Sequence, residues 1–205
     1  MNADGARDVV VANSGSGDLT VGLGDARGGF TTGTAVPSRK AILSLNTVDI
    51  TGDARPDLIA TSLGASDIAI FVNAGQGAFA FSGSYRTGTQ PIAVLAGDVD
   101  RNGQPDISVV NYGSGNLTLL RYFSPAGFLA PTTYGAGGSN PVAAALADFD
   151  GNGTLDIILA DYLSGKVYFL KGDGAGSFGT ATEAITGLIQ PRAMVATRLN
   201  APDEA

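Results

Sequence analysis

An acidic loop that recurs every 49 or 50 residues constrains this chain more than any other feature of its sequence. Each copy carries oxygen-bearing side chains at alternate positions and closes on an aspartate. The closing residues are Asp8, Asp57, Asp106 and Asp156. A period of about 20 to 50 residues is typical of a repeat array with one supersecondary unit per period. The spacing therefore predicts four structural repeats in the 205 residues.

The remainder of each period predicts four short β-strands. An apolar, β-branched run follows the loop, as in residues 107–110, and a Gly/Ser turn leads to a second strand. A Gly-rich bend ends in an aromatic residue, and an Ala-rich strand such as residues 143–147 runs into the next loop. No segment has a helical period. Four strands in about 50 residues are typical of a propeller blade, with the small residues at the crowded centre. We therefore predict an all-β propeller.

We expect one β-propeller domain over residues 1–205, with four four-stranded blades. The predicted bounds are 1–36 plus 190–199 for the first blade, 40–87 for the second, 90–137 for the third and 140–188 for the fourth. The first blade lacks an innermost strand, whereas residues 190–199 resemble such a strand without a blade. We therefore predict that the C-terminal strand pairs with the N-terminal blade and closes the ring. The alternative is an open arc of a larger ring, completed by further sequence or by another copy.

The acidic loops have the chemistry of calcium sites. Ca²⁺ takes about six to eight oxygen ligands, and side chains at alternate loop positions can all point inward. The third loop offers Asp98, Asp100, Asn102, the backbone carbonyl of Gln104, and Asp106. The equivalent residues are Asp148, Asp150, Asn152, Thr154 and Asp156 in the fourth loop, Asp49, Thr51, Asp53, Arg55 and Asp57 in the second, and Asn2, Asp4 and Asp8 in the first. We predict Ca²⁺ as the cofactor, with the first site weak or empty.

Two other interpretations of these loops were weighed. An EF-hand needs a Glu at its twelfth position in a helix, but Ala60, Val109 and Leu159 stand there, in apolar strands. Asp/Asn/Gly turns can also cap hairpins without any metal. Because three carboxylates held close together repel one another without a cation, we favour calcium. The second loop is weaker, since Ala54 occupies the position of Gly103, which we expect to have a positive φ.

Composition excludes several classes of function. Of the 19 acidic residues, 17 are Asp and 11 of these lie in the four loops, which fits short-armed oxygen ligands better than a mixed acidic surface. The net charge of −7 argues against nucleic acid, which needs a basic surface. The chain has no His and no Cys, so it lacks the usual general base and the usual zinc ligands. No apolar run is long enough to insert into a membrane, and no signal peptide is visible in this sequence.

These residues carry a resemblance to a known family. The chain resembles the FG-GAP or VCBS repeat family, whose blades also build the propeller of integrin alpha subunits. The resemblance rests on the Asp-x-Asp-x-Asn-Gly-x-x-Asp loop, on the apolar strand that follows it, and on the Gly-Asp-Gly-x-Gly-x-Phe bend of residues 172–178. It implies a calcium-binding propeller, usually seven-bladed and extracellular, that mediates adhesion or binds ligands. Some members are similar to fungal lectins.

We therefore expect a non-enzymatic, calcium-stabilised scaffold, recognition or adhesion module in an extracellular, cell-surface or periplasmic location. Its partner would be an unidentified protein or glycan, and a homo-oligomer is possible if the four blades do not close. No nucleophile–base pair is legible in the sequence. The alternative is a lectin that uses clefts between blades, where Asn13, Ser62, Asn111 and Asp161 would bind sugar hydroxyls beside Tyr112 and Tyr162. We favour ordinary turn residues at those positions.

Overall fold

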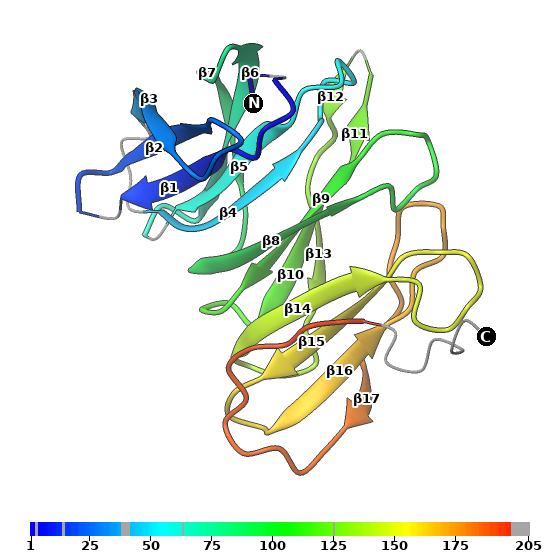
Figure 1. Ribbon diagram of the computed structural model, residues 1–205. Coiled ribbons are helices and arrows are strands. Elements are labelled where there is room, and N and C mark those ends of the chain that lie inside the picture. Colours follow the sequence, from blue (N-terminus) through cyan, green and yellow to red (C-terminus); the bar gives the residue numbers. More distant parts are fainter. Residues whose placement is uncertain (3, 14, 38–41, 63, 125, 198–205) are drawn as a thin grey trace, which may run out of the picture.

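The computed structural model describes residues 1–205 except residues 3, 14, 38–41, 63, 125 and 198–205. Its described residues form seventeen strands and no helix (Figure 1), so none of them makes a helix that could span a membrane. All strand pairs are antiparallel. The predicted all-β class is confirmed.

Fifteen of these strands form four larger sheets in chain order, and β11 and β12 form a separate two-stranded sheet. The first contains β1 (Val9–Asn13), β2 (Asp18–Gly24) and β3 (Phe30–Pro37). The second contains β4 (Ile42–Val48), β5 (Asp57–Ser62), β6 (Asp67–Gly75) and β7 (Ala78–Arg86). The third contains β8 (Pro91–Gly97), β9 (Asp106–Asn111), β10 (Asn116–Leu120) and β13 (Thr132–Gly135), with the small hairpin β11 (Tyr122–Phe123) and β12 (Gly127–Phe128) beside it. The fourth contains β14 (Pro141–Ala147), β15 (Asp156–Asp161), β16 (Lys166–Leu170) and β17 (Thr182–Ile185).

The sheets stack face to face along the chain, because strands such as β5 and β9 are apolar on both faces. Leu58 and Ala60 of β5 face the first sheet, whereas Ile59 faces the third. One apolar cluster fills each gap between neighbouring sheets, and β5 and β9 are buried along their whole length. Each sheet therefore depends on its neighbours for its core, as expected in a repeat array.

The small-residue strands lie on one side of the stack. Figure 1 shows β4, β8 and β14 following one another along this side, and β4 contacts β8 as β8 contacts β14. Ala residues in β8 and β14, and Gly97 at the end of β8, allow the close approach of these two strands, whereas β4 contains neither residue type. We call this side the inner side of the arc.

The predicted closure of the ring is not found in this structure. β1 pairs only with β2 among the described residues, and it lies at the opposite end of the arc from β14 (Figure 1). Residues 191–197 form no strand, and Ala196 and Thr197 line a cavity with residues 147–149 at the end of β14. The C-terminal segment therefore follows the fourth sheet and does not reach the first. Residues 198–199 of the predicted closing strand, and residues 40–41 of the second predicted blade, lie outside the described residues.

Candidate metal centre

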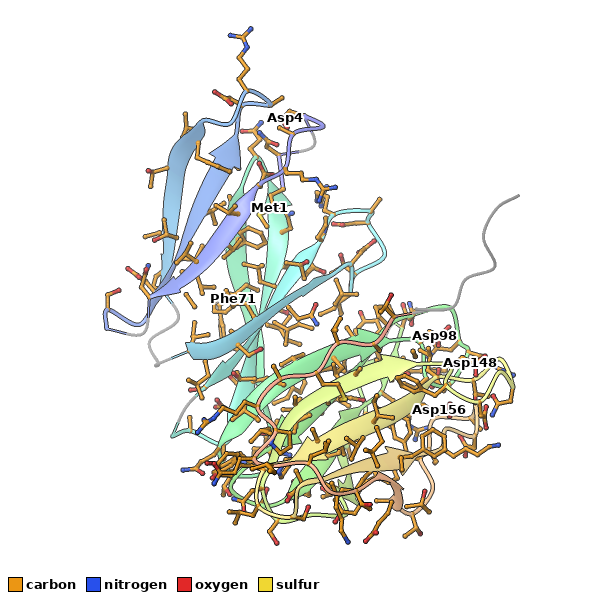
Figure 2. All side chains as sticks on the ribbon, turned by 60° about the horizontal axis from the view of Figure 1, so that its bottom comes forward. Met1, Asp4, Phe71, Asp98, Asp148 and Asp156 are labelled. Carbon is orange, nitrogen blue, oxygen red and sulfur yellow. The ribbon has the colours of Figure 1, made fainter. Side chains whose placement is uncertain are left out.

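The last three acidic loops each follow an inner strand and turn the chain into the next strand of the same sheet. The second, third and fourth loops connect β4 to β5, β8 to β9 and β14 to β15, and the first loop precedes β1. Figure 2 shows the labelled residues Asp98, Asp148 and Asp156 gathered at one end of the third and fourth sheets. The closing aspartate is the first residue of the outgoing strand in the last three repeats.

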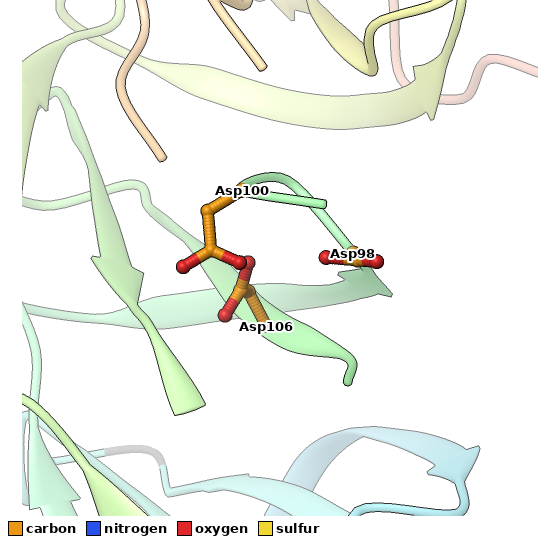
Figure 3. A group of neighbouring side chains, drawn as sticks. All are labelled: Asp98, Asp100 and Asp106. Atoms are coloured by element: carbon orange, nitrogen blue, oxygen red, sulfur yellow. The ribbon is translucent and has the colours of Figure 1, made fainter. Parts of the chain in front are cut away.

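Two loops bring three carboxylates together. In the third loop, one oxygen each from Asp98, Asp100 and Asp106 lies within 4.8 Å of the others (Figure 3). The fourth loop gathers Asp148, Asp150 and Asp156 in the same way. These are the only such clusters among the described residues. Six predicted ligands are thus placed as a hard cation would need them.

The closing aspartate has the same two hydrogen-bond partners in every repeat. Its Oδ2 accepts from the backbone nitrogen seven residues earlier, and its Oδ1 accepts from the backbone N–H sixteen residues later. For Asp106 the donors are Val99 N at 2.9 Å and Tyr122 N at 2.8 Å. The equivalent donors are Ile50 and Asn73 for Asp57, Phe149 and Gly172 for Asp156, and the α-ammonium of Met1 and Gly24 N for Asp8.

This carboxylate therefore ties the start of the loop to the end of the following hairpin strand. Asp57, Asp106 and Asp156 are almost completely buried, at 0–1% exposure, so replacing either N–H bond with water is not possible there. In Asp57, Oδ2 also accepts from Thr51 N at 3.2 Å. A carboxylate oxygen that accepts a single N–H keeps a second lone pair, which is what a metal ion would use. The sequence predicted these residues as ligands but did not predict their role as structural anchors.

The opening aspartate of the second, third and fourth loops organises the turn itself. Asp98 accepts from Asn102 N at 3.0 Å and from Gly103 N at 2.8 Å. Asp148 and Asp49 make the equivalent bonds to residues three to five positions later. These bonds turn the loop back over its own carboxylates.

The amide side chains at the fifth loop position make hydrogen bonds within and across the loop. Asn102 Oδ1 accepts from Gln104 N at 2.7 Å, and its Nδ2 donates to Tyr122 O at 2.9 Å. The amide is therefore oriented with its oxygen in the loop. In the fourth loop Asn152 Oδ1 accepts from Thr154 N at 2.7 Å, and the Thr154 hydroxyl donates to Gly172 O at 3.1 Å.

The first two loops do not form a three-carboxylate cluster in the described residues. In the second loop Arg55 forms an ion pair with Asp53, and Thr51 Oγ1 lies 3.5 Å from Asp49 Oδ1. In the first loop Asn2 Nδ2 donates to Asp4 Oδ2 at 2.7 Å. The α-ammonium of Met1 forms an ion pair with Asp8 Oδ2 at 2.7 Å. Positive groups of the protein thus already neutralise one carboxylate in each of these loops.

Electrostatics differ between the third and fourth loops. Burial raises the pKa of Asp106, and the carboxylate of Asp100 adds to the rise, although the N–H groups of Tyr122 and Val99 oppose it. In the fourth loop Lys171 Nζ lies 2.6 Å from Asp150 Oδ2 and holds the pKa of Asp150 below its ordinary value. The sequence analysis missed Lys171, whose only signal was its place just after β16, two residues before the bend at Asp173.

The donor set fits a calcium ion in two of the four loops. Carboxylate and amide oxygens are ligands that Ca²⁺ prefers, and the Asp106 carboxyl lies buried beside the carboxylates of Asp98 and Asp100. Asp98, Asp100, Asn102, Gln104 and Asp106 would hold the ion in the third loop, and the equivalent five residues in the fourth.

Two of the polar residues at the strand ends that were candidates for sugar binding, Asn111 and Asp161, make hydrogen bonds within the protein. Asn111 is buried and donates to Asn116 Oδ1 and Thr118 Oγ1 at 2.9 Å each. Asp161 is also buried and accepts from the backbone N–H groups of Asn140 and Ser164. These contacts are those of turn residues.

Comparison with known protein families gives a match over the first half of the chain. Residues 1–60 and 49–109 match the model of the FG-GAP-like repeat. The two matches overlap within the second acidic loop, as successive copies of one repeat do. No curated protein matches the chain significantly.

Solved structures of similar fold include two lactonases, one of them putative, and a lectin. A periplasmic gluconolactonase of Pseudomonas aeruginosa has a TM-score of 0.66 at 14% identity, over 94% of this chain and 54% of its own. A putative 6-phosphogluconolactonase of Bacteroides fragilis has a TM-score of 0.66 at 21% identity, and the match covers 95% of this chain and 59% of that protein. An Agrocybe aegerita lectin that recognises non-reducing terminal N-acetylglucosamine has a TM-score of 0.60 at 17% identity, and the match covers 88% of this chain and 49% of the lectin. The chain thus spans about half the length of these structures.

These neighbours support the prediction of a propeller-like fold and correct the prediction about enzymatic activity. The prediction that the chain is not an enzyme is wrong, because propellers of this fold include a gluconolactonase and a putative 6-phosphogluconolactonase. The lack of His and of a legible nucleophile–base pair was too weak a ground for that exclusion. At 14–21% identity the likeness shows a shared propeller-like fold and no more.

Proposed function

The chain belongs to the FG-GAP-like repeat family, and from that premise we propose that it is a calcium-binding propeller module. The third and fourth loops would each bind one Ca²⁺, and the ions would stabilise the hairpins at which the inner strands turn outward. Each sheet would be one blade. The observation that carries this proposal is the pair of carboxylate clusters within 4.8 Å at equivalent positions of successive repeats.

The proposed role of the metal is structural. The loops lie at the edge of the sheets, and their carboxylates are already held by backbone N–H groups, so an ion would complete a preformed turn. Extracellular calcium modules bind with dissociation constants of about 10⁻⁴ to 10⁻³ M. At about 1 mM Ca²⁺ each site would then add roughly 0.4 to 1.4 kcal/mol to the free energy of unfolding by mass action.

Calcium titration followed by calorimetry and by thermal unfolding tests this proposal. We expect two binding events and a melting temperature that falls in EGTA and recovers with Ca²⁺ but not with Mg²⁺ at the same concentration. The variant Asp100→Asn/Asp150→Asn should lose both binding and the calcium-dependent shift. Asp25→Asn/Asp173→Asn removes the same charge from two bends outside the loops and should keep both. Equal loss in both variants, or no heat of binding to the unmodified protein, would reject the proposal.

We further propose a recognition, scaffold or adhesion role in a calcium-rich location outside the cell or in the periplasm. The family and the calcium chemistry support this role, since millimolar affinities are useful only where calcium is abundant. The ligand would be a protein or a glycan.

Carbohydrate binding is the second candidate, and the likeness to the Agrocybe aegerita lectin favours it. A glycan array distinguishes the two. Reproducible hits that are abolished by Tyr162→Ala would support a lectin, because Tyr162 is a half-buried aromatic at a strand end and stacks with Arg192 at 5.0 Å. Hits that survive this substitution would place any glycan site elsewhere.

A further inference from the structure

The inner edge of the first sheet is incomplete. β1 is the edge strand of a three-stranded sheet, whereas β5, β9 and β15 each pair with an inner strand. Val9 and Val11 are 42% and 51% exposed. Their equivalents one repeat later, Leu58 and Ala60, are 0% and 1% exposed, and those in the third and fourth repeats are fully buried. An apolar edge of this kind favours the addition of another strand.

The chain also contains a segment with the sequence pattern of an inner strand, and this segment joins no sheet. Residues 191–197 begin with a proline, as β8 and β14 do at Pro91 and Pro141, and after Arg192 they continue with small and apolar residues. They form no strand, and Val195 is 84% exposed. Arg192 lines a cavity of about 420 Å³ with Leu43, Ile92 and Val142. Since those three residues hold equivalent positions in β4, β8 and β14, the C-terminal segment lies where the next inner strand would begin.

These two halves of one blade lie at opposite ends of the same molecule (Figures 1 and 2). A second copy of the chain brings them together. We propose that residues 191–197 of each copy pair with β1 of the other, so that two open arcs close one ring. The contact is head-to-tail, and a two-fold rotation makes both joints identical, which is how such contacts close instead of forming a filament.

The repeat fixes the register of this pairing. In the third and fourth sheets Val94 pairs with Val109 and Ala144 pairs with Leu159. The equivalent pair is Met194 with Val11 of the other copy. The strands would run antiparallel, with Pro191 opposite Asn13 and Thr197 opposite Asp8, as Pro141 lies opposite Asp161 and Ala147 opposite Asp156.

The exposed side chains agree with the same geometry. Leu58 and Ala60 face the preceding sheet, so Val9 and Val11 face the position where a preceding sheet would stand. The fourth sheet has the complementary face. Ile158 and Phe169 pair across β15 and β16 and are only half-buried, whereas their equivalents in the second sheet, Ile59 and Ile70, are 0% and 3% exposed. The proposed joint would bury both apolar faces at once.

Engineered cross-linking tests the partner and the register together. The chain has no Cys, so the variant Val11→Cys/Met194→Cys has two thiols per copy, and peptide mapping of the oxidised product must join position 11 of one copy to position 194 of the other. Residues opposite each other in antiparallel strands are about 4.5–5.5 Å apart at Cα, which a disulfide can bridge. We expect a covalent dimer under mild oxidation, seen without reductant, and light scattering of the unmodified protein at twice its 20.6 kDa. Val11→Cys/Val195→Cys shifts the register by one residue and should cross-link at least ten-fold more slowly.

A second variant separates the joint from the fold. Val195→Asp places a charge on a residue that is 84% exposed in the single chain, so it should leave the monomer folded and abolish the dimer. Leu163→Asp, at a turn residue that is 69% exposed, is the matched control and should remain dimeric. A monomeric mass at about 0.1 mM protein, a disulfide formed within one chain, or equal cross-linking in both registers would overturn the proposal.

Discussion

At the scale of single residues, the loops show where backbone conformation limits stability. Gly5, Gly103 and Gly153 occupy the sixth loop position with φ between 82° and 85°, and Ala54 occupies it in the second loop with φ 64°. A non-glycine residue in this region costs about 1–2 kcal/mol, partly offset by the lower chain entropy of alanine in the unfolded state. The sequence analysis anticipated this strain from the position alone.

We therefore expect Ala54→Gly to raise the free energy of unfolding by about 0.5–1 kcal/mol, because glycine relieves the positive φ. Urea unfolding in EGTA measures this without any contribution from calcium. Gly103→Ala is the reverse change at the equivalent position and should destabilise by about the same amount. A loss of stability in Ala54→Gly would contradict the assignment of strain to this residue.

The closing aspartate is expected to matter even without metal. Asp106→Asn keeps one acceptor oxygen, so one of the buried N–H groups of Val99 and Tyr122 loses its partner. An unpaired buried N–H costs about 1–3 kcal/mol, and the substitution should lower stability in EGTA by that amount. Asp100→Asn should change stability in EGTA by less than about 0.5 kcal/mol, because Asp100 is half-buried and its bond from Asn102 N can be kept by the amide oxygen. Equal effects of the two variants would show that Asp106 is no special anchor.

These residues also mark the limit of what the sequence could predict. Side-chain identity at alternate positions revealed the loops and their oxygens, because ligands are recognised by residue type. The anchoring partners of Asp57, Asp106 and Asp156 are backbone N–H groups, which every residue except proline possesses, so no residue type revealed them. Only the constant spacing of seven and sixteen residues was available in the sequence.

At the scale of elements, the segment that follows β16 contacts the fourth loop through Lys171. Lys171 neutralises Asp150 at 2.6 Å but is 59% exposed, so it can move away when a cation binds. Exposed ion pairs contribute about 0.2–1 kcal/mol. This pair should therefore reduce the calcium affinity of the fourth loop only modestly.

We expect Lys171→Gln to lower the calcium dissociation constant of the fourth loop by about 1.5- to 5-fold, since a competing cation is removed. Calorimetry in the Asp100→Asn background isolates this loop. Lys166→Gln removes an equal charge from the start of β16, where Lys166 pairs with Glu183 away from the loop, and is the control. A larger tightening in Lys166→Gln would indicate a general charge effect and contradict a specific role for Lys171.

The inner strands explain why the residue pattern alone could not decide which sheet the C-terminal segment joins. The pattern of a proline followed by small residues is the same in β8, in β14 and in residues 191–197. It identifies an inner strand but carries no information on which sheet receives it, because pairing is made by backbone groups. The choice depends on the rotation between neighbouring sheets, which arises from packing in the clusters between them.

At the scale of the whole molecule, stability should decrease from the middle of the arc towards its first sheet. β5 and β9 are buried on both faces and paired on both edges, whereas β1 has one open edge and exposed Val9 and Val11. In repeat arrays each unit is stabilised by its neighbours, so a terminal unit with one neighbour opens at the lowest free energy. Hydrogen exchange should therefore be slowest in β5 and β9.

The same measurement at two protein concentrations distinguishes an open arc from a closed ring. In dilute protein we expect β1 to exchange at least ten-fold faster than β9, because its outer N–H groups have no partner strand. If two copies close the ring, concentrated protein should slow exchange both in β1 and in residues 191–197, while β5 and β9 stay unchanged. Protection of β1 without protection of residues 191–197 would mean that a different segment pairs with this edge. In Val195→Asp the concentration dependence should disappear from both segments together, since each is the other's partner in the proposed joint.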